Sequence, residues 1–169
     1  DVSEDKATCP EAYIAAPSKD NVEVLYEQTT DVEFFNAEKT GSIKIQKRTE
    51  GDINLEGIEF TLSGTSTSGR DISITSKTDA QGVAEFKNIP IGDYTVKESG
   101  GVNAAYLIAE PQKVTVLYAQ QTDVEFFNEL KKGSIKVQKK TKDMTNIEGI
   151  TFTLSGKSDA GTDVNISGK

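Results

Sequence analysis

The sequence predicts an all-β protein in which β-sandwich units follow one another in tandem. Short segments of alternating or β-rich residues recur along the chain, and turn residues separate them. No stretch keeps a helical period over about a dozen residues. The segment DVEFFN at 31–36 returns unchanged at 123–128, and GSIKIQK at 41–47 returns as GSIKVQK at 133–139. Units of domain size that repeat end to end are typical of a protein that spans distance.

The repeat divides the chain into one whole unit and two partial units. Each repeated segment returns after 92 residues, and 133–169 matches 41–77 at 21 of 37 positions without gaps. We therefore expect a complete domain at 41–128. Residues 1–36 are expected to be the C-terminal part of a preceding repeat, and 133–169 the N-terminal part of a following one. The joints between the units are short and charged, which favours a stiff row of domains.

Seven short strands are expected in the complete unit, which is typical of a two-sheet sandwich. In chain order they are GSIKIQKR at 41–48, GIEFTLS at 57–63, RDISITS at 70–76, VAEFKN at 83–88, GDYTVKE at 92–98, QKVTVLY at 112–118 and TDVEFFN at 122–128. The turns that separate them are EGD at 50–52, SGR at 68–70, DAQG at 79–82, PIGD at 90–93 and ESGG at 98–101.

Composition excludes several classes of function. The net charge of −8 disfavours nucleic acid and anionic membranes as partners, because both need clustered Lys and Arg. The chain has no histidine and one cysteine, Cys9, so a His-based triad, a Cys/His zinc site and an internal disulfide are excluded. No apolar run is long enough to cross a membrane, no signal peptide is present and no calcium-loop motif occurs. We expect no metal and no cofactor.

Three polar residues continue the apolar faces of their strands. Strand alternation puts Lys47 in phase with Ile43 and Ile45. The same rule puts Glu98 in phase with Tyr94 and Val96, and Asn128 in phase with Val124 and Phe126. The partial units repeat the pattern with Lys139, Glu4 and Asn36.

The three residues allow three interpretations. They are strand-end side chains that reach solvent, a buried Lys–Glu ion pair capped by an amide, or a reactive group. Burial lowers the pKa of an amine and raises that of a carboxyl, which gives a nucleophilic amine beside a carboxylic acid. The acid could donate to the asparagine carbonyl and shuttle protons. Attack by Lys47 on the side-chain carbonyl of Asn128 would then expel ammonia and leave an isopeptide bond.

These residues carry a resemblance to a known family. The chain resembles the Cna protein B-type (CnaB) domains of Gram-positive surface adhesins and pilins. IKIQKR resembles the family's lysine strand, GDYTVKE its P-G-x-Y-x-x-x-E element and VEFFN its closing asparagine strand. The motifs F-x-L at 60–62 and G-x-A-x-F-x-N-I-P at 82–90 also match. The stretch ESGGVNAAY at 98–106 departs from the family's usual Ala-Pro-x-Gly-Tyr loop.

The resemblance implies a fold, a site and a location. The fold is a Greek-key β-sandwich of the prealbumin, reverse-immunoglobulin type. The site is an autocatalytic cross-link between Lys47 and Asn128 with Glu98 as the catalytic acid. In the partial repeats, Lys139 and Asn36 are the equivalent cross-link residues and Glu4 the equivalent acid. The location is the bacterial cell surface, in the cell wall or a pilus.

The functional expectation is a structural stalk or fibre module that is not an enzyme beyond its own single-turnover cross-linking. Its partners would be neighbouring repeats of the same protein. The alternative is an adhesin domain that binds a host protein or a polysaccharide. A further alternative is that the partial units at the two ends pair between identical molecules, head to tail, and build a filament. Against that pairing we favour the interpretation that the segment is an excerpt from a longer tandem array.

Overall fold

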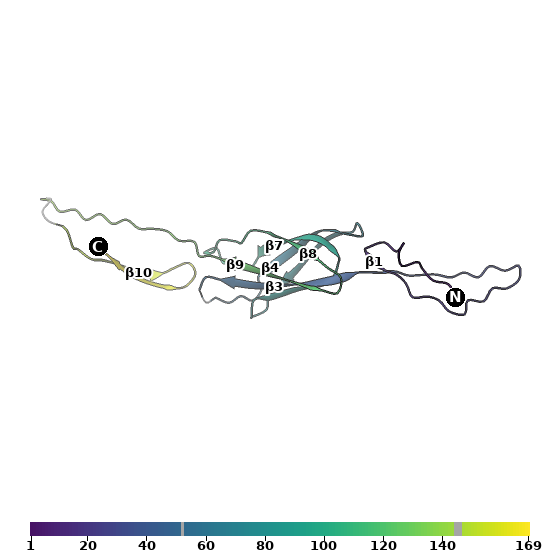
Figure 1. The fold of residues 1–169 in the computed structure, drawn as a ribbon. Helices are drawn as coiled ribbons and strands as arrows, with labels where there is room; N and C mark the ends of the chain where they lie inside the picture. Colours follow the sequence, from purple (N-terminus) through teal and green to yellow (C-terminus); the bar gives the residue numbers. More distant parts are fainter. Residues whose placement is uncertain (52, 144–146) are drawn as a thin grey trace.

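The computed structural model describes residues 1–51, 53–143 and 147–169. Its centre is a sandwich of two sheets (Figure 1). One sheet has the strand order β6-β3-β9 and the other the order β5-β4-β7-β8. The strands are β3 (Thr40–Thr49), β4 (Glu59–Ser66), β5 (Asp71–Lys77), β6 (Val83–Pro90), β7 (Gly92–Gly100), β8 (Gln112–Val116) and β9 (Gln121–Asn128). The all-β sandwich predicted from the sequence is confirmed.

Two smaller pieces flank the sandwich on opposite sides (Figure 1). On the N-terminal side, β1 (Tyr13–Ile14) pairs with β2 (Ala37–Glu38). On the C-terminal side, β10 (Phe152–Lys157) pairs with β11 (Asp163–Gly168) in an antiparallel hairpin. Neither flanking pair of strands joins a sheet of the sandwich. The buried core therefore lies almost wholly between the two central sheets.

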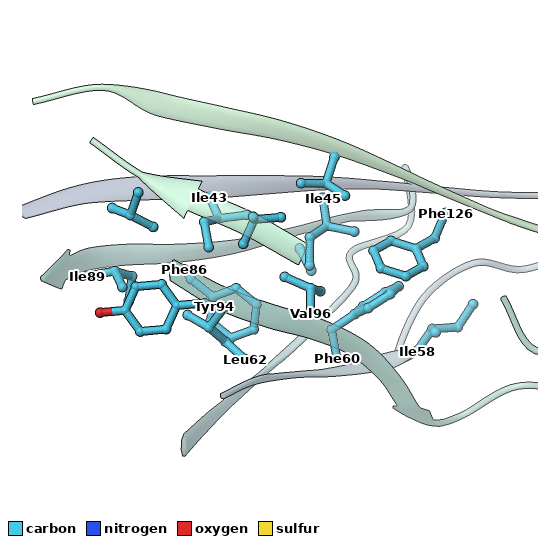
Figure 2. Packing of buried hydrophobic residues seen from close by; sticks show 14 residues of the cluster. Ile43, Ile45, Ile58, Phe60, Leu62, Phe86, Ile89, Tyr94, Val96 and Phe126 are labelled. Carbon is cyan, nitrogen blue, oxygen red and sulfur yellow. The ribbon is translucent and has the colours of Figure 1, made fainter. Parts of the chain in front are cut away.

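Side chains from every strand of the sandwich except the edge strand β5 form the fully buried core (Figure 2). Alternation explains their identity, because every second residue of a strand points to the same face of its sheet. The buried apolar residues of the core are Ile43, Ile45, Ile58, Phe60, Leu62, Ala84, Phe86, Ile89, Tyr94, Val96, Val114, Val116, Val124 and Phe126.

The first and last strands of the sandwich lie side by side and run parallel. In β3 and β9 the register pairs Ser42 with Gln121 at one end and Thr49 with Asn128 at the other. The other edge of β3 pairs with β6 in antiparallel fashion. Because β3 and β9 run in the same direction, Lys47 and Asn128 come to the same end of the sheet.

The strand ends differ slightly from the sequence prediction. The second strand begins at Glu59 and not at 57, because Gly57 has a φ of 83° and belongs to a turn. The strand β8 ends at Val116 and not at 118. The chain turns there, with Ala119 at a φ of 55° and its amide donating to the carbonyl of Thr40.

The segment 133–139 has no strand partner, although its sequence nearly repeats that of 41–47. It is exposed throughout. In the sandwich, the corresponding residues of β3 receive hydrogen bonds from both β6 and β9. Within the described residues no strand lies beside 133–139 as β6 and β9 lie beside β3. The sequence of the segment is therefore not sufficient to make it a strand.

Candidate functional site

Lys47, Glu98 and Asn128 are buried between the two sheets. Their exposed fractions are 0%, 2% and 0%. Lys47 is on β3, Glu98 on β7 and Asn128 at the end of β9. The structure therefore brings the three predicted residues of the complete unit together, and the interpretation that they reach solvent is wrong.

The amine of Lys47 faces the carboxyl of Glu98. Lys47 Nζ lies 3.4 Å from Glu98 Oε1 and donates a hydrogen bond of 3.2 Å to the carbonyl oxygen of Arg48. Burial lowers the pKa of Lys47, while attraction to Glu98 opposes that shift in part. The fold thus favours the neutral, nucleophilic amine more than water does.

Glu98 lies between the amine and the amide. Its Oε2 accepts a 2.9 Å hydrogen bond from Nδ2 of Asn128. Its Oε1, the oxygen that faces Lys47, accepts no hydrogen bond from the described residues. Oε1 is therefore placed to take a proton from Nζ of Lys47, while Oε2 already contacts Nδ2 of Asn128.

The carbonyl of Asn128 points to a backbone amide. Asn128 Oδ1 accepts a 3.0 Å hydrogen bond from the N–H of Ala109. The sequence-based expectation that the acid donates to this carbonyl is therefore wrong for this arrangement. A backbone N–H can only donate, so it takes the carbonyl oxygen and leaves the amide nitrogen to Glu98. An N–H at this oxygen is placed to stabilise negative charge that develops on it.

Two aromatic rings cover the site. Phe126 pairs with Lys47 in the β3–β9 register, and Phe60 pairs with Glu98 in the β4–β7 register. The two rings contact each other, with centroids 4.9 Å apart and planes at 55° (Figure 2). This apolar cover keeps water from the amine and the carboxyl, which strengthens the desolvation of Lys47.

A matching half of the site lies in residues 1–36. Asn36 Nδ2 donates to Glu4 Oε1 at 2.7 Å, and the N–H of Ala16 reaches Asn36 Oδ1 at 3.1 Å and Glu4 Oε2 at 2.9 Å. The two contacts of Asn36 repeat those of Asn128 with Glu98 and Ala109. Hydrogen bonds from Asn36 and Ala16 lower the pKa of Glu4. Among the described residues no lysine forms an ion pair with Glu4.

The remaining predicted residue, Lys139, lies apart from this half-site. It is exposed in the C-terminal piece, while Glu4 and Asn36 belong to the N-terminal piece (Figure 1). Cys9 lies beside the half-site, with Sγ 3.6 Å from Nδ2 of Asn36, and desolvation together with the charge of Glu4 raises the pKa of its thiol.

Sequence reasoning missed the backbone contributions of Ala109 and Arg48. Both act through main-chain atoms, which no residue type reveals. One sequence signal was present: the residue of the N-terminal piece that matches Ala109 is also an alanine, Ala16, whose N–H donates to Asn36.

Other kinds of site find no support in the described part of the chain. It contains no cluster of three His, Cys, Asp or Glu residues that could bind a metal ion. Within the same residues no helix has the length and hydropathy needed to cross a membrane.

Comparison with solved structures finds similar chains from Gram-positive bacteria. The Bacillus anthracis TIE protein is 32% identical over 56% of this chain and 17% of its own, with a TM-score of 0.47. GBS52, the minor pilin of Streptococcus agalactiae, is 23% identical over 60% of this chain and 49% of its own, with a TM-score of 0.46. The major pilin SpaD of Corynebacterium diphtheriae is 17% identical over 61% and 32%, also with a TM-score of 0.46.

In each case the match spans less than half of the other chain. No curated protein matches the sequence. The family described as SpaA, prealbumin-like fold domain, matches residues 41–130, which include all of the sandwich except Thr40, and with it Lys47, Glu98 and Asn128. The chain belongs to the SpaA family of prealbumin-like domains.

Proposed function

We propose that residues 41–128 form a structural module of a pilus-like or stalk-forming protein on the bacterial surface, and that the module locks itself with an isopeptide bond between Lys47 and Asn128. One observation carries the proposal. A lysine and an asparagine are buried with a glutamate between them that contacts both, in an apolar setting that disfavours the charged amine.

The reaction conserves atoms and protons. Glu98 takes a proton from the Lys47 ammonium, and the neutral amine attacks Cγ of Asn128. The carbonyl oxygen becomes an oxyanion, which the N–H of Ala109 stabilises. Glu98 then passes a proton from the attacking nitrogen to Nδ2, with which its Oε2 is already in contact. The C–Nδ2 bond breaks, one ammonia leaves, and the new amide joins the two side chains. The module turns over once and is not an enzyme in the ordinary sense.

The bond would stabilise the domain and carry tension. Linking Lys47 to Asn128 closes a loop of about 80 residues, which by analogy with a disulfide contributes roughly 4–5 kcal/mol. Tension that enters along β3 and leaves along β9 would pass through the bond and bypass the rest of the sandwich. An amide is also not reduced by thiols, which suits an exposed fibre.

The direct test is the intact mass of the denatured, reduced protein. We expect a mass lower than that of the sequence by one ammonia, and a proteolytic fragment in which Lys47 is joined to Asn128. Glu98→Ala and Lys47→Ala should restore the full mass. The matched control is Lys44→Ala, because Lys44 is on the same strand but on the outward face. A wild-type mass equal to that of the sequence would refute the cross-link.

A further inference from the structure

The backbone donor of the proposed site comes from a loop and not from a strand. Lys47, Glu98 and Asn128 are on strands, whereas Ala109 lies between β7 and β8, in residues 101–111. From there its N–H donates to Asn128 Oδ1. This N–H can stabilise an oxyanion only if something fixes the loop against the two sheets.

We propose that Tyr106 is a positioning residue for the cross-linking reaction, and that it fixes the loop so that the N–H of Ala109 meets the carbonyl oxygen of Asn128. The inference rests on the reaction proposed for Lys47 and Asn128. The hydroxyl of Tyr106 donates to the main-chain carbonyl of Glu50 at 3.0 Å. Tyr106 therefore acts through Ala109 and not on the reacting groups themselves.

Tyr106 is buried, although it does not belong to the core between the sheets. It is 2% exposed, while its neighbours Leu107 and Ile108 are 51% and 61% exposed. In the described part of 41–128 it is the one buried hydrophobic residue outside the core cluster. Burial of this ring therefore anchors the loop that carries it.

Backbone hydrogen bonds tie the same part of the loop to the chain that follows β9. Tyr106 forms a β-bridge with Leu130. The N–H of Leu107 donates to the carbonyl of Glu129 at 2.8 Å, and a second hydrogen bond of the same length lies on the other side of the bridge. Since Glu129 directly follows Asn128, the bridge holds the loop against the residue that carries the reacting amide.

The hydroxyl of Tyr106 extends this anchor to the lysine strand. Glu50 directly follows β3, the strand of Lys47. The N–H of Glu50 donates to the main-chain carbonyl of Asn128 at 2.9 Å, and its own carbonyl accepts the hydrogen bond from Tyr106. The loop, the end of β3 and the end of β9 are thus fixed to one another next to the reacting groups.

The anchor is close enough to Ala109 to control its position. Three residues of extended chain span about 10 Å at most, so a fixed Tyr106 restricts where Ala109 can go. A misplacement of about 1 Å can cost on the order of a hundredfold in rate. Loss of one oxyanion donor costs a similar or larger factor, on the order of a hundred- to a thousandfold.

The same arrangement recurs in the N-terminal piece. Tyr13 occupies the place of Tyr106 in the repeat and pairs with Glu38 between β1 and β2. Three residues later, the N–H of Ala16 donates to Asn36 Oδ1 at 3.1 Å. A tyrosine paired with the chain after the closing asparagine, three residues before the donor, accompanies the donor contact in both places.

The test is Tyr106→Phe, which removes one oxygen and keeps the ring. The 169-residue chain is refolded from an unfolded, unlinked state; intact mass follows ammonia loss and circular dichroism follows folding. We expect ammonia loss from the folded chain to be at least about tenfold slower than in wild type. Its pH dependence should keep the wild-type shape, because Lys47 and Glu98 are unchanged.

Tyr94→Phe is the matched control. Tyr94 is also 2% exposed, and its hydroxyl donates to the main-chain carbonyl of Pro90 at 2.8 Å. Pro90 pairs with Thr40, at the opposite end of β3 from Lys47. In a Glu98→Gln background the two tyrosine variants should lose similar stability, but with Glu98 present Tyr94→Phe should cross-link at the wild-type rate. Equal slowing in both variants, or a wild-type rate in Tyr106→Phe, would overturn the inference.

Hydrogen exchange of the Ala109 amide gives a second readout that does not depend on the reaction. In the Glu98→Gln background, Tyr106→Phe should speed this exchange about fivefold or more, and Tyr94→Phe should leave it unchanged. Unchanged exchange in Tyr106→Phe would contradict the positioning role. A wild-type chain that never loses ammonia would refute the proposed function, while the exchange would still report whether Tyr106 holds the donor.

Discussion

At the scale of single residues, the proposed reaction depends on where the protons of Lys47 and Glu98 lie. In that reaction Lys47 must lose a proton to Glu98 before it can attack, and a proton must pass through Glu98 to the amide nitrogen before ammonia can depart. The reactive form of the pair therefore carries one shared proton. Burial beneath Phe60 and Phe126 makes this form accessible, since it disfavours two separate buried charges.

The shared proton predicts a bell-shaped dependence of the cross-linking rate on pH. In acid the pair gains a second proton and the amine stays charged. In alkali the pair loses its proton, and because burial lowers the pKa of Lys47, this loss begins below the ordinary value of 10.5. The measurement is ammonia loss during refolding of unfolded, unlinked chain at a series of pH values. A rate that still rises at the ordinary lysine value would contradict the proton relay.

Replacing the acid should separate chemistry from folding. Glu98→Gln keeps the size of the side chain and removes the proton acceptor, so we expect a folded protein of full, unlinked mass. Its melting temperature should fall by about 20 °C or more, since loss of roughly 4–5 kcal/mol in a domain of this size has that effect. Calorimetry with parallel mass measurement checks both. Glu85→Gln, an exposed change on β6, is the control and should alter neither quantity.

Strand alternation was enough to predict that Lys47, Glu98 and Asn128 share the inward face with apolar residues. It could not predict the donor to Asn128, because Ala109 lies in the irregular segment between β7 and β8, where no period exists. Nor could it predict that segment 133–139 lacks strand pairing. That outcome depends on what lies beside the segment and not on its own residues.

At the scale of the elements, the turn before β6 positions the lysine strand. The N–H of Lys47 donates to the carbonyl of Gly82 at 2.7 Å, and the side chain of Gln46 donates to the carbonyl of Gln81. Gly82 has a φ of 75°, and a Cβ there would lie 2.7 Å from the carbonyl oxygen of Lys47. Only glycine allows this close approach without moving β3.

Gly82→Ala is therefore expected to destabilise the fold by more than about 1 kcal/mol, because β3 must shift near Lys47. Gly69→Ala is the matched control: its φ is 85°, but nothing lies within 4 Å of the added Cβ. Denaturant unfolding of both variants, in a Glu98→Gln background, isolates the close contact. Equal losses of stability would show that backbone strain alone is responsible.

The joint that follows β9 is held by Glu50. Its carboxylate accepts hydrogen bonds from the N–H of Leu130 and from Nζ of Lys132, at 3.1 and 2.7 Å. These bonds lower the pKa of Glu50 below 4.5. The interaction is therefore fully present above that value and is lost as the pH falls through the lowered one.

An NMR titration of the Leu130 amide should show this loss with a midpoint below 4.5, and Glu50→Gln should abolish the transition. A midpoint at or above the ordinary value would mean that the joint is not held by this carboxylate.

At the scale of the whole molecule, the chain enters the sandwich at one end and leaves it at the other, because β3 and β9 are parallel. The flanking pieces accordingly lie on opposite sides (Figure 1). An array of such units would form a line, and the pull on each unit would run along the β3–β9 pair.

Single-molecule stretching should therefore distinguish linked from unlinked protein. Pulled from its two ends, wild-type protein should show no extension from the segment between Lys47 and Asn128. Glu98→Gln should release about 80 residues, or on the order of 250 Å, when the sandwich yields. A step of that size in wild-type protein with confirmed ammonia loss would contradict the proposed path of tension.

The parallel pairing of the first and last strands also has a consequence for folding. Lys47 and Asn128 meet when the first and last strands of the sandwich pair, and we expect this to be a late event because the pairing is highly non-local. A bond made at that moment would form only in chains that have completed folding, and it would be irreversible. Should such a chain later open, its long loop would already be closed, and it would return to the native state without repeating the slowest search.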